Sequence, residues 1–508
     1  MISGGSSDTE LNEAAVNPTK SSSSPRAAMI VTPVANCANA SRNRRSVMAF
    51  RGARSADIGD AVILGGTAKG VKEPRRQRAT TSGFLTDGPE AGKIIFRAKA
   101  TRPLPKSMKA PLSKIVASRY AGRNLPVAVV LPDGGRVPLS ETPEIDIYAR
   151  TWNGLRALAW PQLGKLARAY VHNDIDFSGG ARRVLNVAEA LVGSVSHGSD
   201  AARSRALGWW HQRRGNKANI QHHYDVSNAF YRLWLDERMV YSCAYFKTDA
   251  DTLDQAQAQK LDHVCRKLML KPGEDFLDIG CGWGGLIFWA AQNYGVNATG
   301  ITLSQRQFDY VNAKIAELGL TGRVSIRLVD YAELPADRLY DKIASIGMFE
   351  HVGVRKYPRY FGKIYRLLKP GGMVMNHGIT QNQVGVESLG SGIGDFVEEY
   401  VFPGGQVAHV ARVIEGLAAE GLELIDAEAL REHYARTLWS WVDRLEANAD
   451  IARREVGEEK FRIWRIYLAG SAHAFDRGWL SIFQLLAGKP LPDGKLPHPA
   501  TRDYMYPR

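Results

Sequence analysis

From about residue 275 the chain alternates between short apolar runs and longer stretches in which apolar residues return every three or four positions. Short apolar runs predict strands, and the longer stretches predict amphipathic helices. Strands that alternate with helices are typical of a parallel α/β sheet with helices on its faces. The predicted strands cover residues 275–279, 297–302, 324–329, 342–346 and 373–376, and the predicted helices between them cover 286–294, 305–318 and 356–368.

A smaller unit with a different pattern precedes this region. Apolar runs at 127–131 and 144–148 predict two strands, and Pro-Asp-Gly-Gly at 132–135 predicts a turn between them. Together with the helices that follow, these strands indicate a small α+β unit. The remaining predicted elements are a helix at 155–171, a turn at 173–180 and a helix at 181–192.

Composition divides the chain further. Residues 1–105 are rich in Ser, Ala, Gly and Arg, without a sustained helical or strand period, which predicts a disordered, basic, low-complexity tail. The last third, from about residue 407, predicts helices rich in aromatic side chains. The predicted divisions are the tail at 1–105, the small α+β domain at 106–200, a basic and aromatic linker at 201–225, the α/β domain at 226–488 and a C-terminal tail at 489–508.

Composition also excludes several classes of protein. The chain has 508 residues, which is too long for one ordinary domain. Hydrophobic residues at 44% and charged residues at 23% are average for globular proteins and exclude a fibrous or wholly disordered chain. No apolar stretch reaches the ~18 residues that a membrane-spanning helix needs. Four cysteines without a CxxC pair argue against a disulfide scaffold or a zinc cluster, so we expect no metal site and a reducing cytoplasm.

The net charge of +14 is unevenly distributed. Nine Lys and Arg residues and no acid lie between Glu90 and Asp133. A second basic stretch, 203–217, carries Trp209 and Trp210, which suit the headgroup level of an anionic membrane. Composition alone leaves several interpretations open: a membrane surface, a nucleic acid, or a solvated tail and a linker whose tryptophans dock on the next domain.

A glycine-rich turn follows the first predicted strand of the α/β region, in the sequence Leu-Asp-Ile-Gly-Cys-Gly-Trp-Gly-Gly at 277–285. Glycines let the backbone turn tightly against a ligand at the N-terminus of the next helix. The pattern fits a dinucleotide site, but that site expects an acid after the second strand, where this chain has Gly300-Ile301-Thr302. The turn also resembles motif I of the S-adenosylmethionine-dependent methyltransferases, most of which carry the same acid. A structural turn without a ligand is the third interpretation.

Three further motifs carry a more specific resemblance. They read Tyr-Ser-Cys-Ala-Tyr-Phe at 241–246, Gly-Met-Phe-Glu-His-Val-Gly at 347–353 and Tyr-Val-Phe-Pro-Gly-Gly at 400–405. In this order they resemble the cyclopropane-fatty-acyl-phospholipid synthase family, which includes the mycolic acid cyclopropane synthases. The resemblance runs from about Asn216 to Leu486 and extends more loosely to the small α+β unit.

The resemblance implies a Rossmann-like class I methyltransferase domain with a helical, lipid-binding C-terminal part. It implies S-adenosylmethionine as the methyl donor, held at the glycine-rich turn, with Thr302 and its neighbours in place of the missing acid. Gly-Met-Phe-Glu, where base-modifying enzymes read Asn/Asp-Pro-Pro-Tyr, argues against a nucleic-acid substrate. The residues that the resemblance assigns to the cofactor are Tyr241, Ser242, Asp278, Gly280, Cys281, Gly282, Gly284, Thr302, Leu303, Gln307, Asp330 and Tyr331.

The implied reaction moves a methylene unit to the cis double bond of an unsaturated phospholipid acyl chain and yields a cyclopropane ring and S-adenosylhomocysteine. The resemblance also implies bicarbonate as the base that removes a proton. We expect Glu350 to orient His377, because an ionised carboxylate cannot bond an anion. Ser471 stands where some family members have a cysteine. The residues assigned to the chemistry are Cys243, Glu350, His377, the backbone of Ile379, and Tyr434.

Each of these residues also has a structural interpretation: Cys243 as an inert buried thiol, His377 as a core histidine and Tyr434 as a packing ring. One alternative function is methyl or methylene branching of the acyl chain, and another is a basic module that recruits partners to a membrane or nucleic acid. The partners expected from the resemblance are unsaturated phospholipids and no specific nucleic acid, and a homodimer is compatible with it. We therefore expect a cytoplasmic protein held peripherally at the inner membrane surface.

Overall fold

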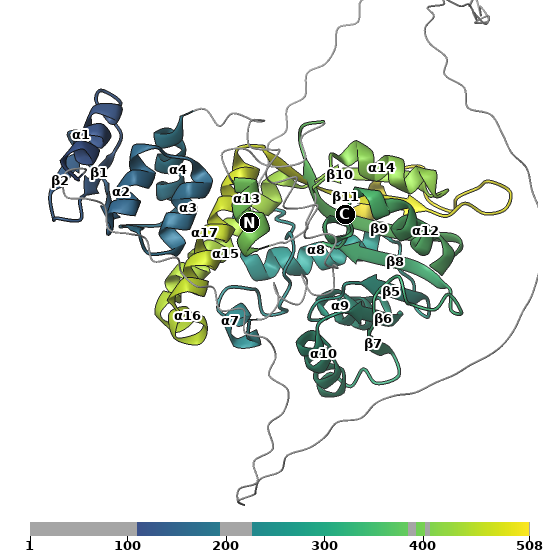
Figure 1. Ribbon diagram of the computed structural model, residues 1–508. Coiled ribbons are helices and arrows are strands. Elements are labelled where there is room, and N and C mark those ends of the chain that lie inside the picture. Colours follow the sequence, from purple (N-terminus) through teal and green to yellow (C-terminus); the bar gives the residue numbers. More distant parts are fainter. Residues whose placement is uncertain (1–108, 194–225, 385–392, 402–406, 507–508) are drawn as a thin grey trace, which may run out of the picture. The chain divides into compact units, whose positions relative to one another are not determined.

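The computed structural model describes residues 109–193, 226–384, 393–401 and 407–506 (Figure 1). The predicted tail at 1–105 and the whole predicted linker at 201–225, with Trp209 and Trp210, lie outside these residues. Within the described ranges, no helix is both long and apolar enough to cross a membrane. In the same ranges, no group of His, Cys, Asp and Glu side chains could hold a metal ion.

A seven-stranded sheet forms the centre of the α/β part. β11 runs antiparallel to both of its neighbours, and the other pairs are parallel, so the sheet is mixed and not wholly parallel as predicted. From one edge to the other the strands are β10 (Glu423–Ala429), β11 (Leu480–Gly488), β9 (Leu368–Gln381), β8 (Tyr340–Ile346), β5 (Asp275–Ile279), β6 (Asn297–Thr302) and β7 (Val324–Leu328).

The five strands predicted from the sequence are confirmed, and β5 and β6 agree residue for residue. The prediction that the last third is helical was incomplete, because it missed β10 and β11. β10 has only Asp426 buried, so its apolar alternation is weak. β11 is a nearly continuous apolar run between two strands, and periodicity alone does not distinguish such a run from a buried helix.

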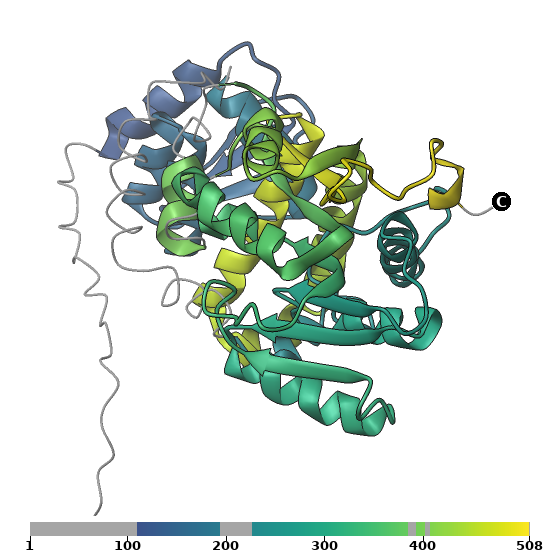
Figure 2. The same ribbon diagram turned by 90° about the vertical axis from the view of Figure 1, so that its right-hand side faces the viewer.

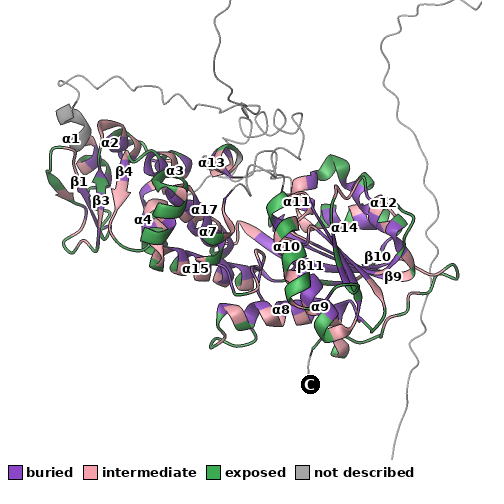
Figure 3. Cartoon of the chain, turned by 90° about the horizontal axis from the view of Figure 1, so that it is seen from below, coloured by how far each residue is buried: buried purple, intermediate pink, exposed green. Residues whose placement is uncertain are grey.

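Helices cover both faces of this sheet (Figures 1 and 2). Successive residues of a strand point to opposite faces of a sheet. In β5, Phe276 therefore belongs to the hydrophobic core on one face, and Leu277 and Ile279 belong to the core on the other face. Figure 3 shows buried residues along the strands and on the inner sides of the helices. The helices on the face of Phe276 are α8 (Leu253–Lys267), α9 (Gly285–Tyr294) and α10 (Gln305–Glu317), and those on the other face are α12 (Tyr357–Leu367) and α14 (Val410–Ala419).

The small unit has a four-stranded sheet of its own, in the order β2 (Arg136–Pro138), β1 (Val127–Val130), β3 (Ile145–Ala149) and β4 (Ile175–Phe177). Its helices are α1 (Lys109–Tyr120), α2 (Trp152–Ala159), α3 (Leu163–Val171) and α4 (Ala181–Val192).

Two predictions for this unit were wrong. The helix predicted at 155–171 is two helices, α2 and α3, because Pro161 cannot continue the helix and disfavours helical backbone in the residue before it. The turn predicted at 173–180 contains β4. The chain comes very close to α2 here: a Cβ on Gly154 would lie 2.1 Å from the backbone oxygen of Asp174, so only glycine fits.

The helical C-terminal part packs against both sheets. α15 and α17 lie against each other and share a core with the residues before α8. Ile466 of α17 and Phe396 of α13 belong to the core of the small unit. The remaining elements are α7 (Asn228–Arg232), α11 (Phe349–Val352), η2 (Val354–Lys356), α13 (Ile393–Tyr400), α15 (Arg431–Ala447), α16 (Ala449–Val456), α17 (Glu458–Asp476) and η3 (Asp503–Met505).

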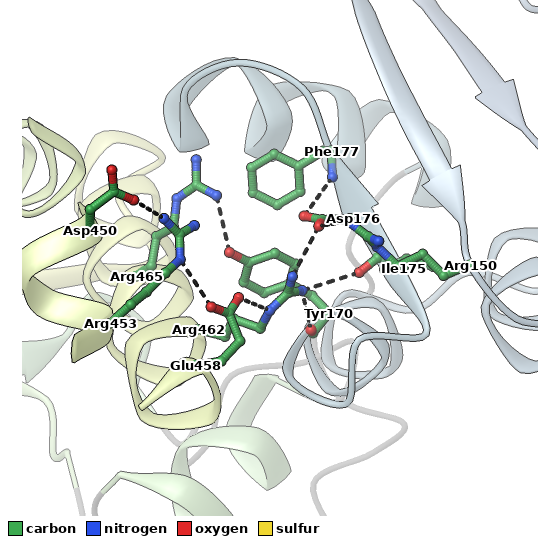
Figure 4. A network of polar contacts seen from close by, with 10 residues as sticks. All are labelled: Arg150, Tyr170, Ile175, Asp176, Phe177, Asp450, Arg453, Glu458, Arg462 and Arg465. Carbon is green, nitrogen blue, oxygen red and sulfur yellow. Dashed lines mark hydrogen bonds and ion pairs between the residues drawn. The ribbon is translucent and has the colours of Figure 1, made fainter. Parts of the chain in front are cut away.

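Two arginines of α17 join it to the small unit (Figure 4). Arg462 has 6% of its side chain exposed and donates to Asp176 Oδ2 at 2.9 Å. It also donates to the backbone oxygen of Tyr170 at 2.9 Å. Arg465 donates to the hydroxyl of Tyr170 at 3.0 Å and lies over the ring of Phe177, 4.5 Å from its centroid. The small unit is therefore fixed to α17 by buried, charge-assisted hydrogen bonds.

The last described residues pack on the α/β part. Met505 is buried, and its backbone oxygen lies 3.3 Å from Nδ1 of His263. Arg502 donates to Asp426 Oδ1 at 2.7 Å. Asp426 also accepts from the fully buried Lys267 of α8 at 2.9 Å. The domain boundary predicted at residue 488 stays a prediction.

Replacing Arg462 by alanine should lower the free energy of unfolding by about 3 kcal/mol, because it leaves the buried oxygens of Tyr170 and Asp176 without this donor. Urea unfolding followed by circular dichroism measures the loss. Arg453→Ala is the matched control, since Arg453 pairs with Asp450 and Glu458 at the exposed surface and should cost under about 1 kcal/mol. Equal losses of unfolding free energy in the two variants would contradict the conclusion that Arg462 fixes the small unit to α17.

Candidate functional site

The glycine-rich turn after β5 gives the backbone conformations that a close ligand needs. Gly280 has a φ of +82°, and a Cβ there would lie 2.6 Å from the Met348 side chain. Gly282 has a φ of +57°, and nothing lies within 4 Å of the position that its Cβ would take. The open side of Gly282 faces a cleft at the carboxyl ends of β5 and β6, the edge at which α/β sheets bind ligands.

Most of the residues assigned to the cofactor lie around this cleft. Two do not line it. Gly284 has a φ of +85° and begins α9, and Asp330 accepts a hydrogen bond from the backbone of Ala332 at 2.9 Å in the turn after β7. The assigned residues that line the cleft are Tyr241, Ser242, Asp278, Gly280, Cys281, Gly282, Thr302, Leu303, Gln307 and Tyr331.

Two buried ionisable groups face this cleft from β5 and α8. Asp278 is 3% exposed, and its Oδ1 has no hydrogen-bond partner among the described residues. Burial raises the pKa of Asp278 to about 7, and the positive charge of Lys260 opposes that shift. Lys260 donates to Ser242 Oγ at 3.0 Å, and burial lowers its pKa to about 8. An unpartnered carboxyl oxygen of this kind fits a ligand with a positive charge or with hydroxyl donors.

Neutral groups occupy the end of β6, where other nucleotide sites have an acid. Thr302 donates from its hydroxyl to the side-chain oxygen of Gln307 at 2.7 Å. Ser304 caps α10 by accepting from the backbone of Gln307 at 3.4 Å. In place of the acid that other nucleotide sites carry after the second strand, this chain therefore has neutral side chains that are packed and hydrogen-bonded to each other.

A second, much larger cavity of about 900 Å³ lies beside the cleft. Its walls come from the α/β part, α13, α14, α15, α17 and the small unit, and are mostly apolar. Ile147, Leu166 and Val184 are among the residues of the small unit that line it. All five residues assigned to the chemistry line this cavity: Cys243, Glu350, His377, Ile379 and Tyr434.

The cleft and the large cavity share a wall. The residues that line both are Tyr241, Ser242, Ile346, Gly347 and His351. Four of them come from two of the motifs that carried the family resemblance, at 241–246 and 347–353. A group bound in the cleft and a chain bound in the cavity would therefore meet at this wall.

Glu350 and His377 lie in the cavity without contacting each other by a hydrogen bond. Glu350 Oε1 accepts from the backbone of Ile379 at 2.7 Å, while its Oε2 has no partner in the described parts of the chain. Both ring nitrogens of His377 likewise lack a partner there. The expectation that Glu350 orients His377 is therefore not met. Gly378 makes room for this arrangement, since a Cβ there would lie 2.8 Å from Glu350 Oε1.

Burial sets the charge states of these two groups. It raises the pKa of Glu350 to about 7 and lowers the pKa of His377 to about 3. At neutral pH the imidazole of His377 is uncharged, with one nitrogen as donor and the other as acceptor. Burial also favours the protonated form of Glu350. The cavity thus holds two groups that can form hydrogen bonds with a ligand in their neutral forms.

Cys243 and Tyr434 are buried residues that also line the large cavity. Burial raises the pKa of the Cys243 thiol, and its Sγ lies 3.2 Å from the backbone oxygen of Ala244, so it is a neutral thiol. The ring of Tyr434 packs edge-to-face against Phe475, with centroids 4.8 Å apart. Tyr434 is thus a packing ring that also lines the cavity.

Sequence reasoning did not assign three buried groups near the wall. Lys260 lies in none of the sequence motifs. His351 lies in the motif at 347–353, but the sequence analysis gave it no role. Burial lowers the pKa of His351 to about 4. Gln484 lies on β11 in register with His377, and neither atom of its amide has a partner among the described side chains. No signal pointed to Gln484, because the strand that carries it was missed.

Comparison with known proteins identifies the family to which the chain belongs. Residues 211–485 match the family model of mycolic acid cyclopropane synthetase. A probable fatty acid methyltransferase of Pseudomonas putida is 41% identical over 383 residues, which are 75% of this chain and 97% of that protein. A probable fatty acid methyltransferase of Mycobacterium tuberculosis is 36% identical over 368 residues, 66% of this chain and 85% of that protein.

Two solved structures resemble the chain over about half its length. The cyclopropane synthase MmaA2 from Mycobacterium tuberculosis has a TM-score of 0.52 at 34% identity, covering 54% of this chain and 98% of that one. The mycolic acid cyclopropane synthase CmaA1 complexed with SAH and CTAB has a TM-score of 0.51 at 35% identity, with the same coverage. The chain therefore belongs to the mycolic acid cyclopropane synthetase family and is an S-adenosylmethionine-dependent methyltransferase with the class I methyltransferase fold.

Proposed function

We propose that this enzyme transfers the methyl group of S-adenosylmethionine to a double-bond carbon of an unsaturated fatty acyl chain. The observation that carries the proposal is the wall shared by the glycine-rich cleft and the apolar cavity, at Tyr241, Ser242, Gly347 and His351. A polar, charged cofactor and an apolar chain require different surroundings, and this wall is where the two surroundings meet.

The cavity suits an acyl chain. Leu158, Leu166, Val184 and Ile466 are among its many apolar lining residues. Each CH₂ group moved from water into such surroundings contributes about 0.8 kcal/mol. A long chain therefore binds by its length alone, and polar groups are needed only where the reaction occurs.

The protein's part in methyl transfer is to hold the two reactants in line. An isolated alkene is a weak nucleophile, so positioning has to supply much of the barrier reduction. S-adenosylmethionine supplies an electrophilic methyl group when bound. Asp278 and Gly282 would hold it in the cleft, and Tyr241 and Ser242, as part of the shared wall, would lie between it and the acyl chain. The buried walls keep water from the cation formed on the chain.

The proton lost from that cation needs an acceptor. Glu350 Oε2 and both nitrogens of His377 are buried without partners in the described part of the chain, which is the arrangement expected around a small polar ligand. Bicarbonate fits these groups and would supply the base when bound. His377 would donate to it, Glu350 in its protonated form would share a proton with it, Tyr434 would donate its hydroxyl to it, and Cys243 would shape the pocket.

Two products remain, and different observations favour them. Methylene branching is favoured by the Pseudomonas putida relative, a probable fatty acid methyltransferase that the chain covers almost completely. A methyl branch would follow if a separate reductant saturated the methylene group. Cyclopropane formation, the second candidate, is favoured by the match of residues 211–485 to the mycolic acid cyclopropane synthetase family. Both products lose a proton from the newly added methyl group, the methylene branch after a 1,2-hydride shift, so a base beside that methyl group would serve either one.

The substrate would be an acyl chain of an unsaturated phospholipid, taken at the cytoplasmic face of a membrane. The basic stretch before Asp133 supports this proposal by its charge. Five of the nine basic residues of that stretch, and the segment with Trp209 and Trp210, lie outside the described residues.

The product can be identified from vesicles of unsaturated phospholipid incubated with the enzyme and S-adenosylmethionine. We expect vinylidene proton signals of a methylene branch in the NMR spectrum of the extracted lipid. Mass alone is insufficient, because both products add one CH₂. Strongly shielded ring protons would assign the cyclopropane product instead, and an unchanged alkene signal would reject acyl methylation.

Glu350→Gln and Tyr434→Phe should each lower turnover on the order of 10²-fold, because each removes one positioned proton-bearing group. Affinity for S-adenosylmethionine should change little, since neither residue lines the cleft. Tyr504→Phe is the matched control: it removes a buried hydroxyl that has no partner among the described residues and lies outside both cavities. Wild-type turnover in both site variants would reject their assignment.

The affinity for S-adenosylmethionine should depend on pH through Asp278. Burial raises the pKa of Asp278 to about 7, so its carboxylate, which attracts the positive sulfonium, forms as the pH rises through that value. Calorimetry should show affinity increasing about tenfold from pH 6 to pH 8. Asp278→Asn should bind more weakly and lose this dependence. The same slope in the asparagine variant would show that another group titrates.

A further inference from the structure

The apolar cavity opens at one place on the described surface. Most of its lining residues are buried or half-buried, and the exposed ones lie on three segments. These are η2, the residues just after β9, and the first half of α14. Two large apolar side chains are exposed there, Val354 at 38% and Val384 at 78%. The exposed lining residues, which we call the rim, are Val354, Arg355, Val384, Ala411, Arg412 and Glu415.

Two of the three rim segments are joined by a backbone hydrogen bond. Gln381 at the end of β9 donates from its backbone to the backbone oxygen of Ala408 at 2.9 Å, just before α14. Gly416 lets α14 lie close against α12, because a Cβ there would be 2.9 Å from the ring of Phe361. α14, which carries part of the rim, is therefore held against both the end of β9 and α12.

The charge around the rim is positive. Between Glu350 and Glu387 the sequence has six Lys and Arg residues and no acid. Arg355 and Arg359 are exposed, and Arg355 makes no hydrogen bond or ion pair with the described residues. Arg412 is paired with Glu415 at 2.9 Å, so those two residues add no net charge. The exposed surface at η2 and the start of α12 thus carries Arg355 next to Val354 on the rim, and Arg359 four residues further along the chain.

We propose that the rim is the surface by which this enzyme docks on a bilayer containing anionic lipid, with Val354 and Val384 in the headgroup layer and Arg355 and Arg359 on lipid phosphates. This inference rests on the proposed function, because it takes the substrate to be an acyl chain of a membrane lipid. It differs from binding through the basic residues before Asp133, since the rim is the opening of the cavity itself.

The physical reason is the cost of exposing an acyl chain to water. Each CH₂ group that crosses water loses its apolar surroundings, so a long chain cannot pass unassisted from bilayer to enzyme. A rim in direct contact with the bilayer removes this crossing. Exposed valines suit the apolar side of the interface, and cations beside them suit the anionic headgroups.

An environment-sensitive fluorophore at the rim tests the contact directly. The label is attached to Val384→Cys in the full chain with Cys37→Ser; Cys243, Cys265 and Cys281 are buried. On adding vesicles of phosphatidylglycerol and phosphatidylcholine, we expect a blue shift of its emission. The matched control carries the label at exposed Thr321→Cys, beside β7, and should show no shift. A rim label that stays in water while the protein co-sediments with the vesicles would overturn the proposal.

Charge reversal tests the cations. Arg355→Glu with Arg359→Glu should weaken binding to the anionic vesicles about 25-fold or more, since each base at an anionic leaflet is worth roughly fivefold. Arg323→Glu with Arg327→Glu changes the net charge equally at β7, on exposed residues outside both cavities, and should bind like the unaltered chain. Equal weakening in the two double variants would overturn the role of Arg355 and Arg359.

Measuring turnover on two forms of the substrate distinguishes docking through the rim from the proposed methyl transfer. The rim variant should lose far more turnover on vesicles than on unsaturated lipid dispersed in neutral detergent, where no bilayer has to be engaged. An equal loss on both substrates would overturn docking through the rim. Absence of product from the unaltered enzyme with either substrate would reject the proposed function, and the fluorescence result, which needs no turnover, would still decide whether the rim docks.

Discussion

The site depends on one segment without regular secondary structure, residues 239–246, which forms part of the wall between the cleft and the cavity. Two helices fix this segment from opposite sides. From α8, Gln257 donates to the backbone oxygen of Ser242 at 2.8 Å, and Lys260 donates to its hydroxyl at 3.0 Å. From α15, Thr437 accepts from the backbone of Ala244 at 3.0 Å. The position of the wall, and with it the geometry of methyl transfer, therefore depends on how α8 and α15 are placed.

The placement of α8 depends in turn on a buried group of charges. Lys267 is fully buried and lies 2.9 Å from Asp426 and 2.6 Å from Glu428 on β10. His263, one turn before it, lies 2.7 Å from Glu428. Such charges are costly to bury and are stable only when each has its partner. α8 therefore has little freedom to rotate or slide, and Arg502 from the C-terminal segment completes the group.

The sequence predicted those features of the fold and the site whose residues are close together in the chain. The glycine turn after β5 and the motif at 241–246 are continuous in the chain, so the cleft residues were largely predicted. Lys260, Gln484 and the Lys267 group come together only through the order of the strands. β10 and β11 lack a clear period, so no sequence pattern indicated that Gln484 lies beside His377. The hydrogen bond from Ile379 to Glu350 likewise follows from a tight approach at Gly378, which sequence spacing does not encode.

The small unit and the chemistry are joined by the same contacts. Its residues Leu166, Tyr170 and Val184 line the end of the cavity away from the rim, and α17 lines it beside them. Arg462 donates to backbone oxygens of this unit as well as to Asp176. These directed hydrogen bonds fix the position of α17 relative to the small unit, which a charge attraction alone would not do. A shift of the small unit would change the shape of the cavity far from the reacting groups. Under the proposed function, the length of acyl chain that binds would therefore depend on this interface, and methyl transfer would occur at the wall between the cleft and the cavity.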